Sequence, residues 1–141
     1  MLKNIDPLLT GRLLRLLDEL GHGDRVGLVD RNFPAYRYEV PVVDLRGADT
    51  ESAARAILQV LPLDNFVDPC VDRMEVDGRP EEITDATRSL QVVAEAAEGR
   101  EVAIGSVERF AFYERARDAM IFVQTGETVP YSCYLLRKGV V

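Results

Sequence analysis

The stretch ELGHGDRVGLVD, residues 19–30, holds His22, the single histidine of the chain, between two glycines. Asp24 and Asp30 follow it in the same stretch. Histidine is the side chain that readily donates and accepts a proton near neutral pH. A carboxylate close to the imidazole stabilises the protonated ring. These residue types at this spacing predict general acid–base catalysis centred on His22.

His22 also has a purely structural interpretation. Residues 8–20 predict a helix that Gly21 stops, so His22 lies just past the negative end of the helix dipole. A protonated ring there could simply stabilise the helix end at the surface. The flanking glycines support the functional interpretation, because they allow the backbone to approach a ligand closely.

Asp30 ends a predicted strand, and polar residues at the carboxyl ends of strands in open α/β sheets tend to face the ligand crevice. Asp30 could orient the imidazole, accept a hydrogen bond from a substrate hydroxyl, or cap the next turn. Arg109 falls in the first turn of a predicted helix, where a cation opposes the dipole. A residue that breaks a local rule suggests a function, and a solvated arginine is the alternative.

Two residues near the C-terminus could join such a site. Tyr131 follows Pro130 ahead of the last predicted strand, where its hydroxyl could point into a cleft, although packing explains most tyrosines. Cys133 has no histidine close to it in sequence, so an inert thiol is favoured over a nucleophile. Phe112, Ala116 and Met120 recur at helical spacing, and this stripe is expected in the core.

Composition excludes several classes of protein. The chain has 141 residues, 47% of them hydrophobic and 29% charged, which predicts one globular domain over residues 1–141. The net charge of −7 argues against partners with a phosphate backbone and against anionic membranes. Cys70 and Cys133 lie outside any CxxC motif, so with one histidine no metal site is expected.

The location expected from the sequence is the cytoplasm. Two isolated cysteines suit a reducing compartment. The N-terminal segment contains Asp6 and Pro7 and has no continuous apolar run, unlike a signal peptide. No stretch approaches the roughly 18 apolar residues that a membrane span needs.

The motifs of serine hydrolases, P-loop proteins and dinucleotide-binding proteins are also absent.

Helices and strands alternate along the predicted elements. Apolar periodicity and caps predict helices at 8–20, 51–62, 79–99 and 107–120. Strands are predicted at 25–30, 39–45, 70–76 and 101–105, with two more in 121–136 around a turn at Thr125 and Gly126. Pro41 places the strand at 39–45 at a sheet edge or at its own start. This order predicts a single-domain α/β sandwich in which helices pack on a mixed sheet.

Six motifs occur in the order found in one known family. They are MLKNIDPLL at 1–9, GHGD at 21–24, VDRNFPAY at 29–36, RFAFYERA at 109–116, TGE at 125–127 and PYSCYLLRKGVV at 130–141. In these motifs the chain resembles the RbsD/FucU family, most closely its fucose mutarotase branch, from the first residue to the last. The resemblance implies the family's α/β fold and an isomerase that interconverts anomers or ring forms of a free monosaccharide, L-fucose above all.

The resemblance also implies roles for particular residues. His22 matches the family's proton donor, Asp30 its substrate-contacting aspartate, and Arg109 the arginine of the fucose branch. The segment Tyr131, Ser132 and Cys133 matches a substrate-binding segment. No metal or organic cofactor is implied. The expected partners are the sugar and further copies of the chain, in a ring that is commonly a decamer, with the sugar site near a subunit interface.

Three positions depart from the pattern of the fucose branch. Asn32 and Tyr36 stand where that branch has histidines, and Cys133 replaces an asparagine. A thiol is a weak hydrogen-bonding group compared with an amide. The departures leave two alternatives to an enzyme open, a sugar-binding or sensing module without efficient turnover and a scaffold. In the enzymatic mechanism that we expect, His22 is the acid that Asp30 orients, while Arg109 and Tyr131 fix sugar hydroxyls.

Overall fold

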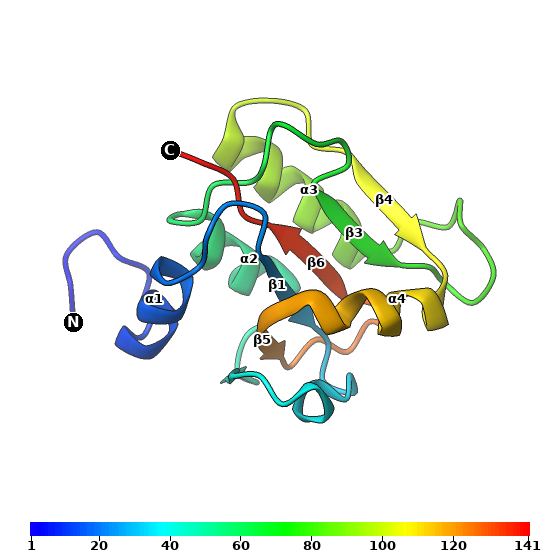
Figure 1. Cartoon of the computed structure of the whole chain (residues 1–141), viewed down its shortest axis with the longest axis horizontal. Helices are drawn as coiled ribbons and strands as arrows, with labels where there is room; N and C mark the ends of the chain where they lie inside the picture. The colour runs from blue at the N-terminus through cyan, green and yellow to red at the C-terminus, as the bar shows by residue number, and fades with distance from the viewer.

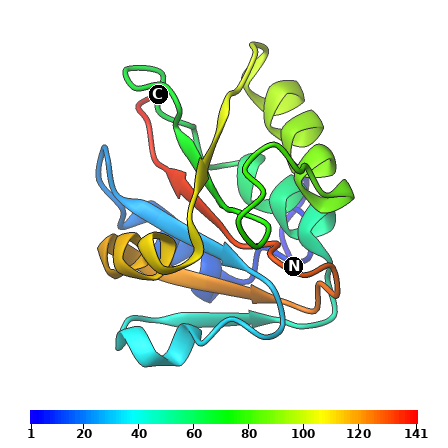
Figure 2. The same cartoon turned by 90° about the vertical axis from the view of Figure 1, so that its right-hand side faces the viewer.

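One mixed sheet of six strands organises the chain in the computed structural model, which describes all residues 1–141. The strands lie in the order β2-β5-β1-β6-β3-β4, which Figure 2 shows from the cyan β2 to the yellow β4. Strand β6 is antiparallel to both of its neighbours, β1 and β3, while the other pairs are parallel. The strands are β1 Arg25–Val29, β2 Val42–Leu45, β3 Val71–Met74, β4 Ile104–Val107, β5 Ala119–Thr125 and β6 Tyr134–Arg137.

Helices cover both faces of this sheet and make three layers (Figures 1 and 2). Helices α2 and α3 lie on one face, and α4 lies on the other. Two short 3₁₀ helices, η1 and η2, complete the set. The helices are α1 Gly11–Asp18, η1 Ala35–Tyr38, α2 Thr50–Leu58, α3 Asp85–Glu98, α4 Arg109–Arg115 and η2 Ala116–Asp118. The mixed α/β sandwich predicted from the sequence is confirmed.

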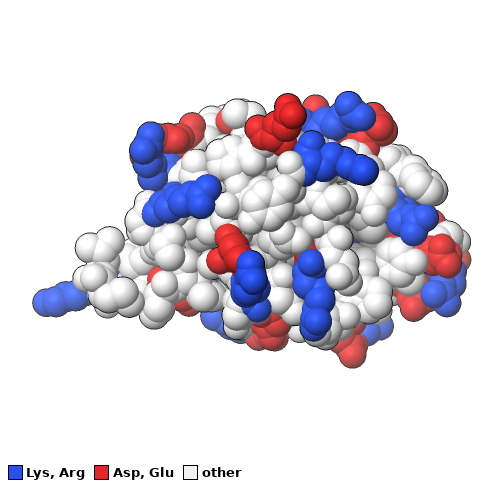
Figure 3. Space-filling view, turned by 90° about the horizontal axis from the view of Figure 1, so that it is seen from below, with Lys and Arg blue, Asp and Glu red and all other residues white.

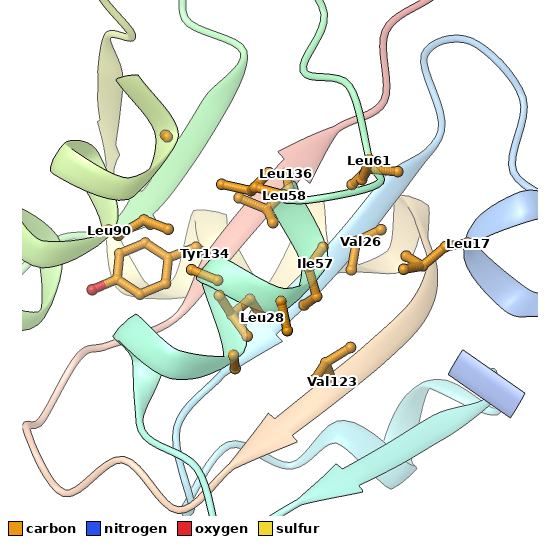
Figure 4. Packing of buried hydrophobic residues seen from close by; sticks show 14 of the residues in the cluster. Leu17, Val26, Leu28, Ile57, Leu58, Leu61, Leu90, Val123, Tyr134 and Leu136 are labelled. Carbon is orange, nitrogen blue, oxygen red and sulfur yellow. The ribbon is translucent and has the colours of Figure 1, made fainter. Parts of the chain in front are cut away.

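The two faces of the sheet bury separate hydrophobic clusters. The larger, of 26 buried residues, joins the sheet to α1, α2 and α3; Figure 4 shows Leu17, Val26, Ile57 and Leu90 within it. The smaller, of 12 buried residues, lies under α4 and η1. Alternate residues of each strand point to opposite faces, so a short apolar strand supplies both clusters at once.

Side-chain caps begin the helices where the sequence places polar residues. Thr10, Asp49 and Thr84 each accept the backbone N–H three positions later. The helix predicted at 79–99 begins only at Asp85, because its cap is Thr84. Gly99, at a positive φ of 65°, ends it as predicted.

Three other local predictions are wrong. The helix at 107–120 begins at Arg109, because β4 continues to Val107 and Glu108 caps the helix. Met120 consequently lies on β5 and is exposed, while Phe112 and Ala116 are buried as predicted. The last two strands form no hairpin, since β5 and β6 both pair with β1 and residues 126–133 make a long connection. Pro41 does precede an edge strand, β2.

Candidate functional site

The carboxyl ends of the parallel strands meet at one edge of the sheet, and a small hollow of about 220 Å³ opens there. This volume is below the roughly 300–1,000 Å³ of drug-sized pockets, so it suits a small ligand. Four residues predicted from the sequence line it, namely Asp30, Arg109, Tyr131 and Cys133. Asn32, Phe33, Met74, Tyr113 and Pro130 complete the lining.

Asp30 is the buried carboxylate of the hollow. It directly follows β1, and its Oδ1 accepts the backbone N–H groups of Asn32 at 2.9 Å and Phe33 at 3.0 Å. Burial raises the pKa of Asp30 above its ordinary value, although these two N–H groups and the thiol of Cys133 act in the opposite direction. Asp30 is therefore a cap, as one interpretation of the sequence held, and also a carboxylate of raised basicity beside a hollow.

Cys133 lies directly beside Asp30. Its side chain is buried, and burial, followed by the charge of Asp30, raises the pKa of the thiol well above its ordinary value. The group is thus a neutral thiol at physiological pH, which is a poor nucleophile and a weak hydrogen-bond donor. This agrees with the inert thiol favoured by the sequence.

Arg109 presents a cation at the rim of the hollow. It is the first residue of α4 and is exposed, with its guanidinium carbon 4.7 Å from the centre of the Phe110 ring. It takes part in none of the ion pairs of the chain. Its donors are therefore free for a ligand, at a position that the helix dipole does not favour.

Tyr131 lines the hollow from an unusual backbone conformation. Its φ is +63°, the left-handed region that costs energy for a residue with a side chain. The N–H of Cys133 donates to the Tyr131 carbonyl at 2.9 Å and helps to hold this bend. Ser132, between them, does not line the hollow; its hydroxyl is buried and has no hydrogen-bond partner.

Glu127 fastens the connection that carries Tyr131. Its Oε2 accepts the N–H of Thr50, at the start of α2, at 3.1 Å. Its Oε1 accepts the N–H groups of Thr128 at 2.8 Å and Val129 at 2.9 Å. Burial raises the pKa of Glu127, but the hydrogen bonds with Val129, Thr50 and Thr128 together outweigh burial and hold the pKa below its ordinary value. Glu127 occurs in the sequence analysis only within the TGE motif at 125–127, and its role in fastening this connection was not predicted.

His22 lies at the opposite end of β1. The five residues of β1 span about 17 Å at the usual rise of a strand, so His22 and Asp30 of one chain do not meet. The expectation that Asp30 orients the imidazole is wrong within one chain. The carboxylate that does contact the ring belongs to Asp64, with Oδ2 lying 3.2 Å from Nε2.

A second and larger hollow, of about 810 Å³, adjoins His22. Helix α1, residues 60–62 and the last four residues of the chain form its walls. The amine of Lys138 donates to the carbonyls of Leu17 and Leu20 at the C-terminal end of α1. Lys138 therefore takes the helix-stabilising position that the structural interpretation assigned to His22.

The turn that carries His22 is tightly defined. The Asp24 carboxylate accepts the N–H of Gly21 at 2.7 Å, so Asp24 shapes the turn rather than contacting the imidazole. Gly23 has a φ of +89°, and a Cβ there would lie 3.2 Å from the guanidinium of Arg137. Glycine is thus required at this position by its backbone.

Asp64 and Arg137, which lie near His22 at the start of β1, were not predicted from the sequence. Asp64 is fully buried, which no periodic pattern around it predicts, and the ring of Phe66 packs edge-on against His22 with centroids 5.5 Å apart. The Asx turn between Asp64 and the N–H of Phe66 is a local signal that a sequence search could have used.

Three further features concern the chain as a whole. No group of three or more His, Cys, Asp or Glu side chains is positioned to hold a metal ion. None of the helices has both the length and the apolar character to cross a membrane. On the face in Figure 3, basic side chains are separated by uncharged surface and by acidic groups, so this face has no continuous basic patch.

Comparisons with known proteins concern the family and the fold of the chain. The sequence model of the RbsD/FucU transport protein family matches residues 3–141. Atu2016, a putative sugar-binding protein, is 42% identical over 100% of this chain and 97% of its own, with a TM-score of 0.94. FucU from Bifidobacterium longum is 37% identical, with a TM-score of 0.91, over 99% of each chain. The fucose mutarotase from Streptococcus pneumoniae, solved with L-fucose, is 33% identical, with a TM-score of 0.90, over 99% of each chain.

Proposed function

Because the chain belongs to the RbsD/FucU transport protein family, we propose that it is a mutarotase that interconverts anomers or ring forms of a free monosaccharide. The observation that carries the proposal is the hollow at the carboxyl edge of the sheet. There a buried carboxylate, an unpaired guanidinium and a tyrosine at positive φ converge on a space of small-molecule size. These groups offer acceptors and donors to hydroxyls and require no charge on the ligand.

An L-fucose-like sugar is the proposed substrate. Two of the similar proteins are FucU and a fucose mutarotase, the latter solved with L-fucose. In the hollow, the Asp30 carboxylate accepts from a sugar hydroxyl and the Arg109 guanidinium donates to one. The apolar part of the lining, with Phe33 and Met74, suits the C–H face and methyl group of a 6-deoxy sugar.

Mutarotation requires a proton on the ring oxygen and the loss of a proton from the anomeric hydroxyl. In our proposal, protonated His22 supplies the first and the Asp30 carboxylate accepts the second. Each positioned proton transfer contributes about 10²–10⁴-fold in rate. The ring oxygen gains one proton as its bond to the anomeric carbon breaks, and closure on the other face of the aldehyde reverses both transfers.

This chemistry requires two copies of the chain, because His22 and Asp30 of one chain lie at opposite ends of β1. We propose that His22 of a neighbouring copy completes the hollow at Asp30, Arg109 and Tyr131. The assembly is a ring of identical copies, a decamer in the form that the family resemblance implies. Each interface of such a ring holds one sugar site.

Anomer exchange measured by saturation-transfer NMR tests the function directly. The panel contains L-fucose, D-ribose, other pentoses and other 6-deoxyhexoses, and the mass of the assembly is measured in the same buffer. We expect acceleration greatest for L-fucose and lost in His22→Ala. Equal exchange rates with and without the protein for every sugar would exclude a mutarotase.

A sugar-binding module without turnover is the second candidate. The observation that favours it is the neutral thiol of Cys133 beside Asp30, which offers a sugar less than the amide that it replaces. Atu2016, the 42% identical relative, is a putative sugar-binding protein. Calorimetric binding of a sugar whose anomer exchange stays at the uncatalysed rate would favour this module over the enzyme.

A further inference from the structure

Asp64 is a fully buried carboxylate far from the hollow at Asp30, and no step of the proposed reaction uses it. Its Oδ1 accepts the backbone N–H of Phe66 at 2.9 Å. Its Oδ2 accepts Nε of Arg137 at 3.0 Å and lies 3.2 Å from Nε2 of His22. A buried carboxylate is costly unless donors surround it, so both of its oxygens are committed to these three partners.

The charge state of Asp64 decides which nitrogen of His22 carries a hydrogen. The N–H of Phe66, followed by the side chains of His22 and Arg137, holds the pKa of Asp64 below its ordinary value, although burial acts in the opposite direction. Asp64 is therefore ionised at neutral pH, and an ionised carboxylate only accepts hydrogen bonds. Nε2, which faces it, must then be the protonated nitrogen.

The neutral imidazole carries one N–H, so a hydrogen on Nε2 leaves Nδ1 bare. The contact with Asp64 is the one ion pair that the ring makes within the chain. The His22 side chain is 46% exposed, and Phe66 packs edge-on against the ring. The ring is thus held through Nε2 and remains open to a ligand elsewhere.

The backbone keeps Asp64 and His22 in register with each other. The N–H of Asp64 donates to the Arg137 carbonyl at 3.0 Å. The N–H of Gly23 donates to the Lys138 carbonyl at 2.8 Å. Both segments are therefore attached to the same end of β6, so the carboxylate and the imidazole have little freedom to separate.

We propose that Asp64 is the positioning residue of His22, holding Nε2 so that Nδ1 is the atom that exchanges a proton with the sugar. This inference rests on the mutarotase proposal. Ring opening starts from the doubly protonated imidazolium, in which both Nε2 and Nδ1 carry a hydrogen. Nδ1 gives its proton to the ring oxygen as the C–O bond breaks, and Asp30 of the neighbouring copy takes the proton of the anomeric hydroxyl. Nδ1 is then bare and ready to accept the proton back on closure, while Nε2 keeps its hydrogen throughout.

The tautomer is measurable in the unmodified protein. With a single histidine in the chain, a ¹⁵N spectrum of the imidazole contains one pair of ring nitrogens and needs no assignment among histidines. At a pH where the ring is neutral, we expect Nε2 to appear protonated and Nδ1 bare. A protonated Nδ1, or an even mixture of the two tautomers, would overturn the inference without involving any variant.

The variant Asp64→Asn tests whether the tautomer matters for turnover. An amide can donate as well as accept, so we expect the two tautomers to become mixed. We expect kcat for anomer exchange to fall at least about tenfold, with KM changed by less than about twofold, because the sugar contacts remain while the proton donor is misplaced. Asp64→Asn that keeps both the parent tautomer and the parent kcat contradicts the role of Asp64.

Asp18→Asn is the matched control. Asp18 lines the same hollow as His22, is exposed and forms no ion pair, so this variant removes the same charge without touching the ring. We expect Asp18→Asn to keep the kcat and the ¹⁵N shifts of the parent. If Asp18→Asn and Asp64→Asn lost kcat equally, the loss would come from the removed charge alone, and the positioning role of Asp64 would be refuted. A parent protein with the expected tautomer but no anomer exchange would refute the mutarotase while leaving the Asp64–His22 contact established.

Discussion

At the scale of single residues, Asp30 has a structural role and, in the proposed mechanism, also a chemical one. It caps the turn after β1 through two backbone N–H groups, and its burial raises its pKa. A carboxylate of raised pKa is a stronger base, which suits the removal of a proton from an anomeric hydroxyl. Stability and chemistry therefore make opposing demands at this position.

Asp30→Asn separates these two demands. In the folded protein the Asp30 pKa is above its ordinary value of 3.8, so its contribution to stability is fully present below pH 3.8 and is lost as the pH rises through the folded value. The amide keeps an acceptor for both N–H groups without a charge. We expect the variant to be at least as stable as the parent at pH 7 and to lack anomer exchange.

Urea unfolding of both proteins between pH 3 and pH 7 measures this difference. The gap in the free energy of unfolding should widen in favour of Asp30→Asn as the pH rises. A gap that stays constant across this range would mean that the buried carboxylate is not the source of the effect. Asp118→Asn, at an exposed site outside the hollow, is the control for charge.

Arg109 is predicted to serve binding and not the fold. Its guanidinium is exposed and forms no ion pair, and Arg109 is the first residue of α4, at the N-terminal end where the helix dipole disfavours a cation. Arg109→Ala should change the free energy of unfolding by no more than about 0.5 kcal/mol. Sugar affinity should fall by about 1.5–3 kcal/mol, the usual value of a hydrogen bond to a charged group.

The measurement for Arg109→Ala is calorimetric titration with L-fucose beside thermal unfolding. Arg117→Ala provides the comparison, since Arg117 pairs with Glu114 on the surface and lies outside the hollow. Equal affinities in the Arg109 variant and the parent would remove this guanidinium from the site.

At the scale of elements, Glu127 joins the connection between β5 and β6 to the start of α2. Glu127→Gln should destabilise the protein by about 1–3 kcal/mol, because an amide cannot accept at both ends and leaves a backbone N–H unpaired. Since this connection carries Tyr131, we also expect weaker sugar binding.

The pH dependence of this effect has the opposite sign to that of Asp30. The Glu127 pKa is held below its ordinary value of 4.5, so its stabilisation is present above pH 4.5 and is lost as the pH falls through the folded value. The free energies of unfolding of the parent and Glu127→Gln should therefore become equal as the pH is lowered. A difference between them that stays constant down to pH 3 would count against the carboxylate as the cause.

The sequence predicted elements better than their mutual arrangement. Caps and glycine stops located the helices to within a few residues. The exceptions are the helices predicted at 79–99 and 107–120, which begin later, after the caps Thr84 and Glu108. The hollow at Asp30 follows from one rule, that strand ends gather at one edge. Asp64 could not be predicted as a partner of His22, because their proximity depends on both segments joining the end of β6.

At the scale of the whole molecule, His22 and Asp30 lie at opposite ends of β1, so the proposed mechanism requires two copies of the chain at each site. His22→Ala and Asp30→Asn should each abolish exchange when prepared alone. If the two variants are unfolded together and refolded in equal amounts, random assembly should restore about a quarter of the sites, because each site draws one residue from each of two symmetry-related copies.

The mixing experiment has a direct negative outcome. Sites built within one chain would never regain both residues, so the refolded mixture would stay inactive. Refolded wild-type protein, treated identically, gives the activity to which the quarter is compared. The mass of the mixed assembly should equal that of the parent.

Strand β6 runs through the middle of the sheet between β1 and β3, with Cys133 at one end and Lys138 at the other. Its four residues are flanked by hydrogen-bonded neighbours on both edges, and three of them are buried. β6 is therefore a short, rigid strand whose two ends cannot move independently of each other. In the proposed assembly, the distance between His22 and Asp30 of two copies therefore depends on how one copy docks against the next, so substitutions at that contact, far from the sugar, would change turnover.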